Sequence, residues 1–363
     1  MCHLLNNNTH LSSSSPQSWS TLSENEVFNR NNCSCDVYKN RFIILAGGSR
    51  IDQRYGCTDY LQSVEIYDTE TDKIVKRLPD LPFSGRSKGA ILNGYFYTNR
   101  FADGFLYRAP LSLDDDDKIQ DKEEEWEKVA EGLHKFSDIL ISDHKQYLFL
   151  LCYNGKMIRY DPVEDKCMEM PSMPTPRIYC TAAVVKSQIY VIGGAESDVV
   201  EVFDIPTQSW SQTTPMSQAL EKASATAVKK RWIVVTGGFT DDEETNDMTY
   251  ILDTYTHRWS TYEEPLSGLS RSSKESNNKC LWFGTTVVSL GGETMEGINI
   301  ESLVPEWGSK NHLILLRRLV EDGRAHPSTE KSYKITEKEK DVIKILTMDA
   351  CFDMFREVLT YFQ

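Results

Sequence analysis

One short unit recurs along this chain, and it restricts the possible fold more than any other feature of the sequence. An apolar strand ends in Gly-Gly, a second strand follows and ends in an acidic residue, and a large or apolar side chain comes six residues later. The glycine pairs are Gly47-Gly48, Gly193-Gly194, Gly237-Gly238 and Gly291-Gly292. The acids and their later partners are Asp68 and Ile74, Asp204 and Trp210, Asp253 and Trp259, and Glu301 and Trp307. A spacing kept in four places indicates one repeated structural unit.

The distance between the outer glycine pairs sets the number of units. Gly48 and Gly292 lie 244 positions apart, which makes five steps of about 49, close to the period of roughly 50 seen in propeller blades. Two units must therefore lack the glycine pair. The segment 91–111 carries Thr98-Asn99 where the glycines would be, and the segment 146–171 keeps the acid and its spacing as Asp161 and Cys167. We predict six units.

Each unit is consistent with four short antiparallel strands, which we name A to D. In the unit around residue 190, "TAAVVKS" is strand A, "QIYVIGG" is strand B, "VVEVFD" is strand C, and strand D carries the tryptophan. Asn93-Gly94 is a strong signal for a type I′ turn between strands A and B. Glycine at the end of strand B permits a positive φ and a close backbone approach. Trp210 and Trp259 are expected to fill the wedge between neighbouring sheets, and sheets stacked around an axis bury both of their faces.

The unit resembles the kelch repeat, whose consensus combines a double glycine with a spaced tyrosine and tryptophan. Residues 173–210 match that pattern along nearly their whole length, and the resemblance extends over residues 16–309. It implies an all-β, six-bladed kelch β-propeller. The sequence departs from the consensus in the two units without Gly-Gly and in Ile74 and Cys167, which replace the tryptophan.

Two tryptophans compete for the closing strand of the last blade. "QSWS" at residues 17–20 repeats "QSWS" at 208–211, so Trp19 is placed to supply a final strand D from the N-terminal end, as in many kelch propellers. Trp307 stands in register for the same role. The sequence leaves both alternatives open.

Charge and cysteine content exclude several classes of protein. The net charge of −14 argues against partners such as duplex nucleic acid or an anionic membrane, which favour a basic surface. Half of this excess comes from residues 114–127, an acidic stretch expected to form a solvated loop between strands C and D of the second blade. Nine cysteines and no recognisable signal peptide favour reduced thiols in a cytoplasmic or nuclear protein.

Three segments are predicted to lie outside the propeller. Residues 1–15 are polar and expected to be disordered, and residues 310–335 form a linker of unclear structure. Residues 336–363 begin with a capping-box pattern and place apolar residues at alternating steps of three and four, which predicts an amphipathic C-terminal α-helix. This helix could dock on the propeller, bind a partner or dimerise.

Signatures of catalysis are missing from the sequence. The histidines stand in no metal-binding or catalytic motif, and there is no phosphate-binding glycine loop or nucleophile elbow. Cys33 and Cys35 form a C-x-C pair without a second cysteine pair, which favours buried thiols over a metal site. The "KKR" at 229–231 fits an A-to-B turn better than a nuclear signal. Copper radical oxidases share the kelch fold, but no residues here match their ligands, so we predict no catalytic residues, metal or cofactor.

A binding surface is expected where the B-to-C and D-to-A loops meet, because strand direction brings both sets to one face. The residues expected there are Arg50, Arg86, Arg177, Tyr179, Phe239 and Arg271. Guanidinium groups bind carboxylates bidentately, so an acidic peptide or a C-terminal carboxylate is the expected partner. The resemblance implies the same, since kelch adaptors bind partner peptides on this face. An arginine before strand A could instead cap backbone carbonyls between blades, Arg177 above all.

These features predict a non-enzymatic protein-interaction module. One alternative is a substrate receptor of a ubiquitin ligase that uses its C-terminal helix for recruitment, since no BTB or F-box pattern precedes the propeller. The other is a propeller enzyme acting on a sugar or small metabolite.

Overall fold

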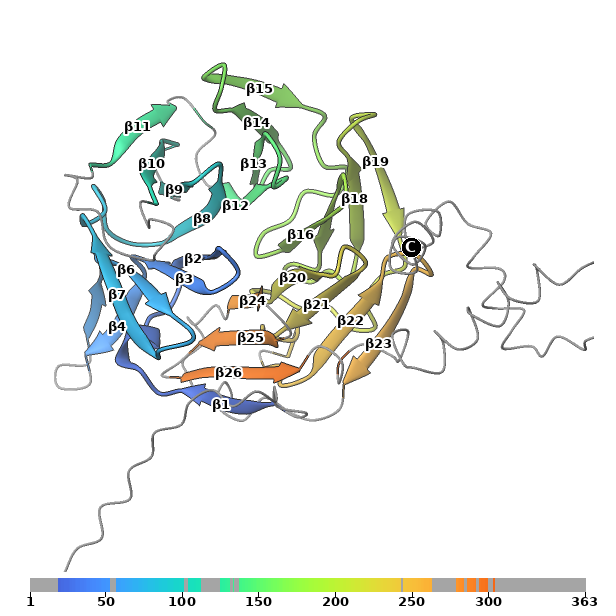
Figure 1. Ribbon diagram of the computed structural model, residues 1–363. Coiled ribbons are helices and arrows are strands. Elements are labelled where there is room, and N and C mark those ends of the chain that lie inside the picture. The colour runs from blue at the N-terminus through green and yellow to red at the C-terminus, as the bar shows by residue number, and fades with distance from the viewer. Residues whose placement is uncertain are drawn as a thin grey trace, which may run out of the picture. The chain divides into compact units, whose positions relative to one another are not determined.

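Six four-stranded antiparallel sheets are arranged as the blades of a propeller (Figure 1). The computed structural model describes residues 19–52, 57–100, 104–111, 125–130, 133, 137–242, 244–262, 279–283, 286–291, 294–299 and 303. The described residues are almost entirely strands, turns and loops, with one short 3-10 helix, η1 (Glu26–Phe28). The predicted all-β, six-bladed fold is therefore confirmed.

Each blade contains strands A to D in the predicted order. Blade one is β2 (Ser34–Tyr38), β3 (Phe42–Ala46), β6 (Val64–Asp68) and β7 (Lys73–Leu78), with a hairpin of β4 (Ser49–Asp52) and β5 (Cys57–Tyr60) inserted between strands B and C. Blade two is β8 (Ser87–Leu92), β9 (Tyr95–Arg100), β10 (Leu106–Pro110) and β11 (Glu127–Ala130). Blade three is β12 (Ser137–Ser142), β13 (Leu148–Cys152), β14 (Met157–Asp161) and β15 (Lys166–Met170).

The remaining blades follow the same plan. Blade four is β16 (Thr181–Val185), β17 (Gln188–Ile192), β18 (Val200–Asp204) and β19 (Ser209–Thr213). Blade five is β20 (Ser224–Val228), β21 (Trp232–Thr236), β22 (Thr249–Asp253) and β23 (Arg258–Tyr262). Blade six combines β24 (Lys279–Phe283), β25 (Thr286–Gly291) and β26 (Thr294–Asn299) with β1 (Ser20–Ser23) from the N-terminal part of the chain.

The A strands form the innermost ring. β2, β8, β12, β16, β20 and β24 contact one another in that order, and β24 contacts β2 to close the ring. Each A strand has one edge without a strand partner, and side chains of the neighbouring blade accept hydrogen bonds from some of the backbone amides on that edge. The Ile91 amide donates to the Asp36 side chain, the Ala225 amide to Thr181 and the Cys280 amide to Ser224. Hydrophobic clusters fill the wedges between successive blades, for example Ile233 and Leu252 against Tyr190 and Val202. The core therefore lies between the sheets.

Trp19 and β1 close the propeller. β1 pairs antiparallel with β26, with Ser20 opposite Gly297 and Thr21 opposite Glu296, and so takes the strand D position of blade six (Figure 1). The Trp19 ring is buried, and its Nε1 donates a hydrogen bond to Thr249 in blade five. The N-terminal alternative is therefore the one the fold uses, and Trp307 lies outside the described residues.

Tryptophans on strand D join their blade to the preceding one. The Nε1 atom donates to a backbone carbonyl of the preceding D-to-A loop, in Trp210 to Pro171 at 2.8 Å and in Trp259 to Thr214 at 3.0 Å. Trp126 does the same with Pro79 at 2.8 Å. Trp210 packs against the hydrophobic cluster between blades three and four and Trp259 against the one between blades four and five, so each ring has both an apolar contact and a hydrogen bond.

The acid at the end of strand C binds the backbone of the turn that follows it. The carboxylates of Asp68 and Asp253 accept backbone N–H groups two residues later, from Glu70 and Tyr255. Arg41 and Arg231 also bind these carboxylates through two nitrogens each. Burial is the largest single influence and would raise the pKa of Asp68 and of Asp253, but the arginine hydrogen bonds, the arginine charge and the hydrogen bonds of the turn together hold both pKa values below the ordinary value.

The glycine pairs are needed because the B-to-C loop touches the loop that precedes strand A of the same blade. Gly48, Gly194 and Gly238 have φ values of 91°, 124° and 88°. A Cβ atom on Gly238 would lie 2.6 Å from the Glu221 carbonyl oxygen and 2.8 Å from the Ala223 nitrogen. In blade two, β9 continues through Thr98-Asn99 to Arg100, which lies opposite Ser87 in β8.

We expect Gly238→Ala to destabilise the protein by about 2–4 kcal/mol, because a left-handed φ and a backbone clash both oppose it. Thermal unfolding followed by circular dichroism measures the effect. Gly94→Ala is the matched control, since Gly94 has a similar φ of 77° but its Cβ would meet nothing within 4 Å. Equal losses in the two variants would show that φ alone, and not the close approach, requires glycine.

Several sequence predictions fall outside the described residues. These are Gly292, Arg271, the tail 1–15, the linker 310–335 and the C-terminal helix 336–363. The acidic segment is described only at its ends, which confirm that it connects strand C (β10) to strand D (β11) of blade two. Among the helices that the structure describes, none has the length and apolar character needed to cross a membrane.

Candidate functional site

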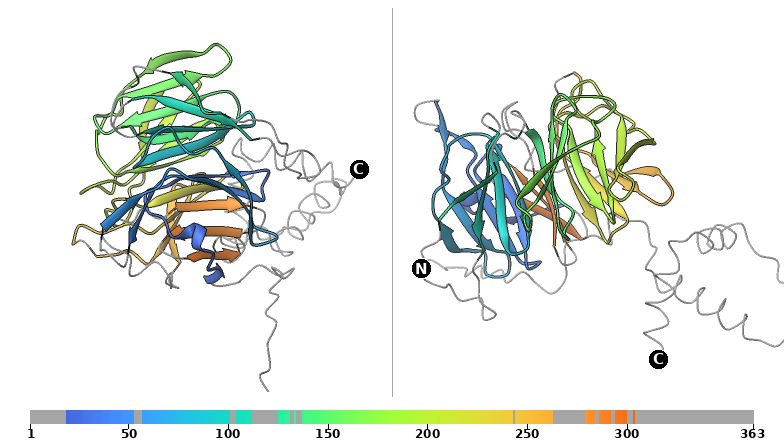
Figure 2. Two further views of the ribbon diagram at one scale, coloured as in Figure 1. Left: turned by 90° about the vertical axis from the view of Figure 1, so that its left-hand side faces the viewer. Right: turned by 90° about the horizontal axis from the view of Figure 1, so that it is seen from above.

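The B-to-C and D-to-A loops meet at one face, which we call the arginine face. Seen from the side, the strands run between the two faces, so every connection emerges at one of them (Figure 2). The amides of Asn31 and Ser49 donate to each other's carbonyls, and Glu221 and Phe239 do the same. Ala195 donates to Ile178 in blade four. Each of these bonds joins a B-to-C loop to the D-to-A loop before it, as strand direction predicted.

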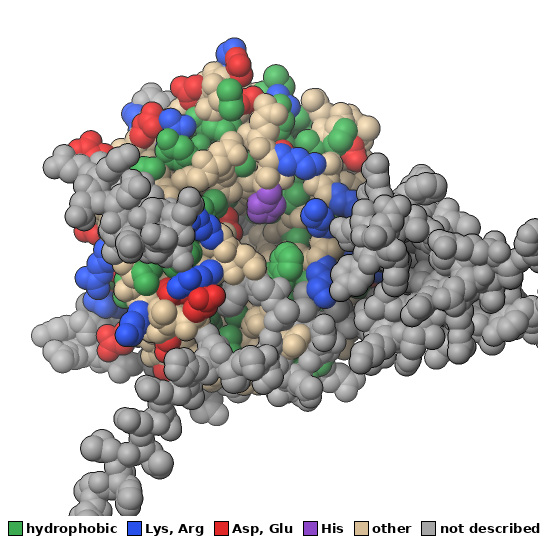
Figure 3. All heavy atoms as spheres, viewed as in Figure 1, with side chains coloured by type: hydrophobic (Ala, Val, Ile, Leu, Met, Phe, Trp, Pro, Cys, Tyr) green, Lys and Arg blue, Asp and Glu red, His purple; other side chains and the backbone are tan. Residues whose placement is uncertain are grey.

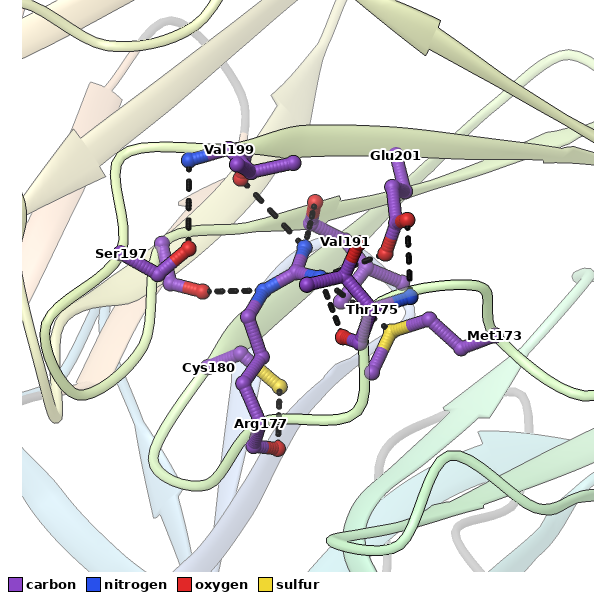
Figure 4. A network of polar contacts seen from close by, with 9 residues as sticks. Met173, Thr175, Arg177, Cys180, Val191, Ser197, Val199 and Glu201 are labelled. Atoms are coloured by element: carbon purple, nitrogen blue, oxygen red, sulfur yellow. Dashed lines mark hydrogen bonds and ion pairs between the residues drawn. The ribbon is translucent and has the colours of Figure 1, made fainter.

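Arg177 is buried below this face. Its guanidinium binds the Glu201 carboxylate at 2.5 Å and donates to the backbone carbonyls of Thr175, Val191, Gly193 and Val199 (Figure 4). The Arg177 side chain is 4% exposed and the Glu201 side chain 0%. Arg177 therefore caps the carbonyls at the end of strand B, and its guanidinium is inaccessible to a partner. The alternative role suggested by its place before strand A describes it better than partner binding.

The buried arginine–glutamate pair of blade four recurs in blade one but not in blade five. In blade one, Arg30 binds Glu65 at 2.7 Å and donates to the carbonyls of Val27, Gly47 and Ser63. Glu65 and Glu201 hold the same position on strand C. Blade five has an apolar pair at the matching positions, Leu220 and Tyr250, which belong to one hydrophobic cluster. The fold therefore accepts either a buried ion pair or an apolar contact here.

Arg86, Tyr179 and Lys222 are brought together on the arginine face from the loops before blades two, four and five. The Arg86 guanidinium lies 5.9 Å from the Tyr179 ring centre, and the Lys222 Nζ lies 4.9 Å from the same ring. Lys222 also lies 5.4 Å from the Phe239 ring. Cations at these distances are attracted to the face of an aromatic ring. We call Arg86, Tyr179, Lys222 and Phe239 the cation–aromatic cluster.

Local backbone geometry places two members of this cluster. Tyr179 and Lys222 each stand two residues before strand A, with φ values of 59° and 57°. The Lys222 amide donates to the Tyr179 carbonyl at 2.9 Å, which ties the two loops together. A left-handed conformation costs an L-residue about 1–2 kcal/mol. Asn32, two residues before strand A of blade one, has a φ of 54°, so this left-handed position recurs in the repeat and gives each of these side chains the same backbone setting.

Accessibility differs among the predicted site residues. Arg86 and Tyr179 are half-buried, as is Lys222, whereas Phe239 is 6% exposed and supports the cluster from below. Arg50 is exposed on the β4–β5 hairpin, where it pairs with Asp59 at 3.2 Å. The Glu221 carboxylate lies 3.6 Å from Lys222 and partly neutralises it.

Some residues of this face were missed by reasoning from the sequence. Lys222 could have been found by aligning it with Tyr179, because both precede strand A by two positions. Tyr60, Tyr153 and Ile178 are exposed apolar side chains on loops or on the hairpin of this face. Nothing in their local sequence distinguished them from residues of the core.

The described residues offer no metal centre. Within them, no group of three or more His, Cys, Asp or Glu side chains could hold an ion. Cys33 and Cys35 are buried. Their inward position between blades one and six explains them as core residues.

Comparisons with known proteins match the repeat in blade four most clearly. The family model described as the Kelch motif matches residues 176–217. An F-box/kelch-repeat protein of Arabidopsis thaliana is 39% identical over 54 residues, which are 14% of this chain and 15% of that protein. Kelch-like protein 40a of Danio rerio is 25% identical over 99 residues, 25% of this chain and 16% of that protein. The matches thus cover a small part of each relative's length. Together with the repeated Gly-Gly unit and the six blades, the kelch motif identifies the chain as a kelch-repeat β-propeller.

Proposed function

We propose that this protein is a non-enzymatic interaction module that binds a partner peptide on its arginine face. The observation that supports this most directly is the cation–aromatic cluster, in which loops of three blades contribute Arg86, Tyr179 and Lys222. Tyrosine and arginine are the residues most enriched among the anchors of protein interfaces. Tyr60, Tyr153 and Ile178 add apolar surface on the same face. Kelch-repeat propellers are typical protein-interaction modules, and the relatives fit this function.

The chemistry of the cluster favours a carboxylate-bearing peptide. Arg86 offers a planar guanidinium group that matches the geometry of a carboxylate. Lys222 offers a second cation near the same Tyr179 ring. The Tyr179 ring near both cations can pack against the aliphatic part of a peptide side chain. An acidic side chain or a C-terminal carboxylate would satisfy all three groups.

A charge reversal tests this function. We expect the double variant Arg86→Glu, Lys222→Glu to keep its fold and to lose at least about tenfold in affinity for its peptide, equivalent to about 1.4 kcal/mol. The measurement is fluorescence anisotropy with ligands selected from arrays of acidic and free C-terminal peptides. Lys73→Glu, Lys166→Glu is the matched control, because these lysines are exposed on the outer D strands of blades one and three. Peptides that bind both variants equally well would exclude the cluster as the site.

A second candidate is a substrate receptor of a ubiquitin ligase. The observation that favours it is the similarity to an F-box/kelch-repeat protein, although this extends over 54 residues. In that case the propeller would hold the substrate, and the segment 336–363 would recruit other components. Affinity purification of the full chain and of a chain without residues 336–363 separates the candidates. Partners lost only on truncation would support recruitment by this segment, and partners unaffected by it would argue against the second candidate.

A further inference from the structure

The opposite face of the propeller carries the A-to-B turns, and these turns are basic. The turn residues are Lys39 and Asn40, Asn93 and Gly94, His144 and Lys145, Lys186 and Ser187, and Lys229 and Lys230. Among these, Lys39, His144, Lys145, Lys186, Lys229 and Lys230 are all exposed, and we call them the lysine ring. Figure 3 shows this face, with a histidine and several basic side chains around a central hollow. The confirmed turn at 229–231 accounts for the "KKR" sequence.

Turn geometry does not explain these lysines. Lys39, Lys186, Lys229 and Lys230 have φ values of 49°, 58°, 47° and 53°, and His144 has 57°. Left-handed positions in such turns favour Gly, Asn and Asp, and blade two uses Asn93-Gly94, with φ values of 52° and 77°. The other described turns therefore place cations where the backbone favours other residues. Residues that oppose a local preference tend to occur at functional sites.

Two members of the lysine ring, His144 and Lys230, line a cavity on the propeller axis. The cavity has a volume of about 500 Å³, and its lining includes His144, Lys230 and Asn40 from the turns. The inner strands contribute apolar walls, such as Ala225, Leu281 and Trp282. This volume lies within the range of about 300–1,000 Å³ that is common for small-molecule sites.

Two carboxylates of this face, Asp36 and Asp143, accept hydrogen bonds from backbone amides. Asp36 lines the cavity, but its two oxygens accept the amides of Val37 and Ile91, and burial raises its pKa although His144 opposes the rise. Asp143 accepts three backbone amides of its own turn. The acidic segment 112–124 leaves blade two at this face, where the Leu111 amide donates to the Gly94 carbonyl.

We propose that the lysine ring and the cavity mouth bind a compact polyanion bearing several phosphate groups. The turns of blades one, three, four and five carry these cations around the propeller axis, and His144 and Lys230 reach the cavity mouth from two of these blades. A compact ligand at the mouth can therefore meet positive charge from more than one side. Lysine binds phosphate as a point charge and needs no planar, bidentate geometry in the ligand. The arginines next to these turns, Arg41 and Arg231, are already paired with Asp68 and Asp253. This site is independent of the arginine face.

The test uses isothermal titration calorimetry of the full chain with inositol hexakisphosphate and with inorganic tripolyphosphate. The variant Lys229→Asn, Lys230→Gly installs the residues that the turn prefers, so we expect the ligand-free protein to melt at the same or a higher temperature. The same variant should lose at least about tenfold in affinity for either probe. Lys73→Ala, Lys166→Ala removes two outer lysines and should bind as the wild type does.

The competing outcomes are distinct. A wild-type protein that shows no binding at about 1 mM probe would overturn the proposal, as would equal affinity in the Asn-Gly variant. A polyglutamate peptide that binds as tightly as the phosphate probes would also overturn it, in favour of a site for acidic chains. The arginine-face variant Arg86→Glu, Lys222→Glu should bind the phosphate probes as the wild type does. A negative result with the phosphate probes would therefore not bear on the proposed peptide binding, which is tested separately.

Discussion

Replacing Arg177 with leucine should destabilise the propeller by about 3–5 kcal/mol, because removing one partner of a buried ion pair leaves the other charge uncompensated. Glu201, at 0% exposure, would keep only the Thr175 amide at 3.1 Å as a described hydrogen-bond donor. Four backbone carbonyls would also lose a donor. Urea denaturation measures the loss as a shift of the unfolding midpoint. Arg50→Leu is the control: its exposed pair with Asp59 should contribute no more than about 1 kcal/mol.

Blade five suggests a second variant that tests the cause. Leu220 and Tyr250 hold the positions that Arg177 and Glu201 hold in blade four. The double variant Arg177→Leu, Glu201→Tyr should therefore recover a large part of the lost stability, because no buried charge remains. Recovery should be incomplete, because the Gly193 carbonyl would still lose its hydrogen bond from Arg177. In blade five the equivalent Gly237 carbonyl accepts a hydrogen bond from the Asn246 side chain instead. If the double variant is as unstable as Arg177→Leu alone, uncompensated charge is not the cause.

Removing residues 1–23 should have a comparable or larger effect, because it deletes Trp19 and β1 and leaves β26 as an open edge. A large-to-small change at one buried tryptophan alone costs about 3–5 kcal/mol. The paired backbone from Ser20 to Ser23 and the Leu22 contact at Gly297 would be lost as well. An exposed strand edge also promotes aggregation. Melting temperature and light scattering are the two measurements.

Two controls define this experiment. Removing only residues 1–15, the predicted tail, should leave the melting temperature unchanged. Adding a synthetic peptide of residues 16–25 to the shortened protein should restore stability, since an added strand can complete an open sheet. A protein without residues 1–23 that melts like the full chain would show that β1 does not hold blade six to blade five.

The repeating parts of the fold could be predicted because local chemistry determines them. The Asn93-Gly94 turn has positive φ at both positions, as its sequence demands. The acid at the end of strand C binds the amides of its own turn, as in Asp204 and Thr207. Trp210 then follows Asp204 at the spacing of six residues that recurs along the chain. Such features depend on neighbours a few positions away, so spacing is sufficient to identify them.

The candidate sites depend on neighbours that spacing does not encode. Arg86 stands one residue before its strand A and Arg177 four residues before its own, and one reaches the Tyr179 ring on the surface whereas the other is buried against Glu201. The difference arises because the Glu201 carboxylate lies on strand C of the same blade, more than 20 residues away. The sequence could assign the residue type but not its surroundings.

The sequence by itself determined the blade, the number of blades and the face on which each loop emerges, because strand alternation and turn chemistry are local. Only the tertiary structure decided that Trp19 closes the ring, that Arg177 is internal, and that cations from separate turns gather around one axis. These features join residues from different blades, and they exist only once the sheets have closed into a ring.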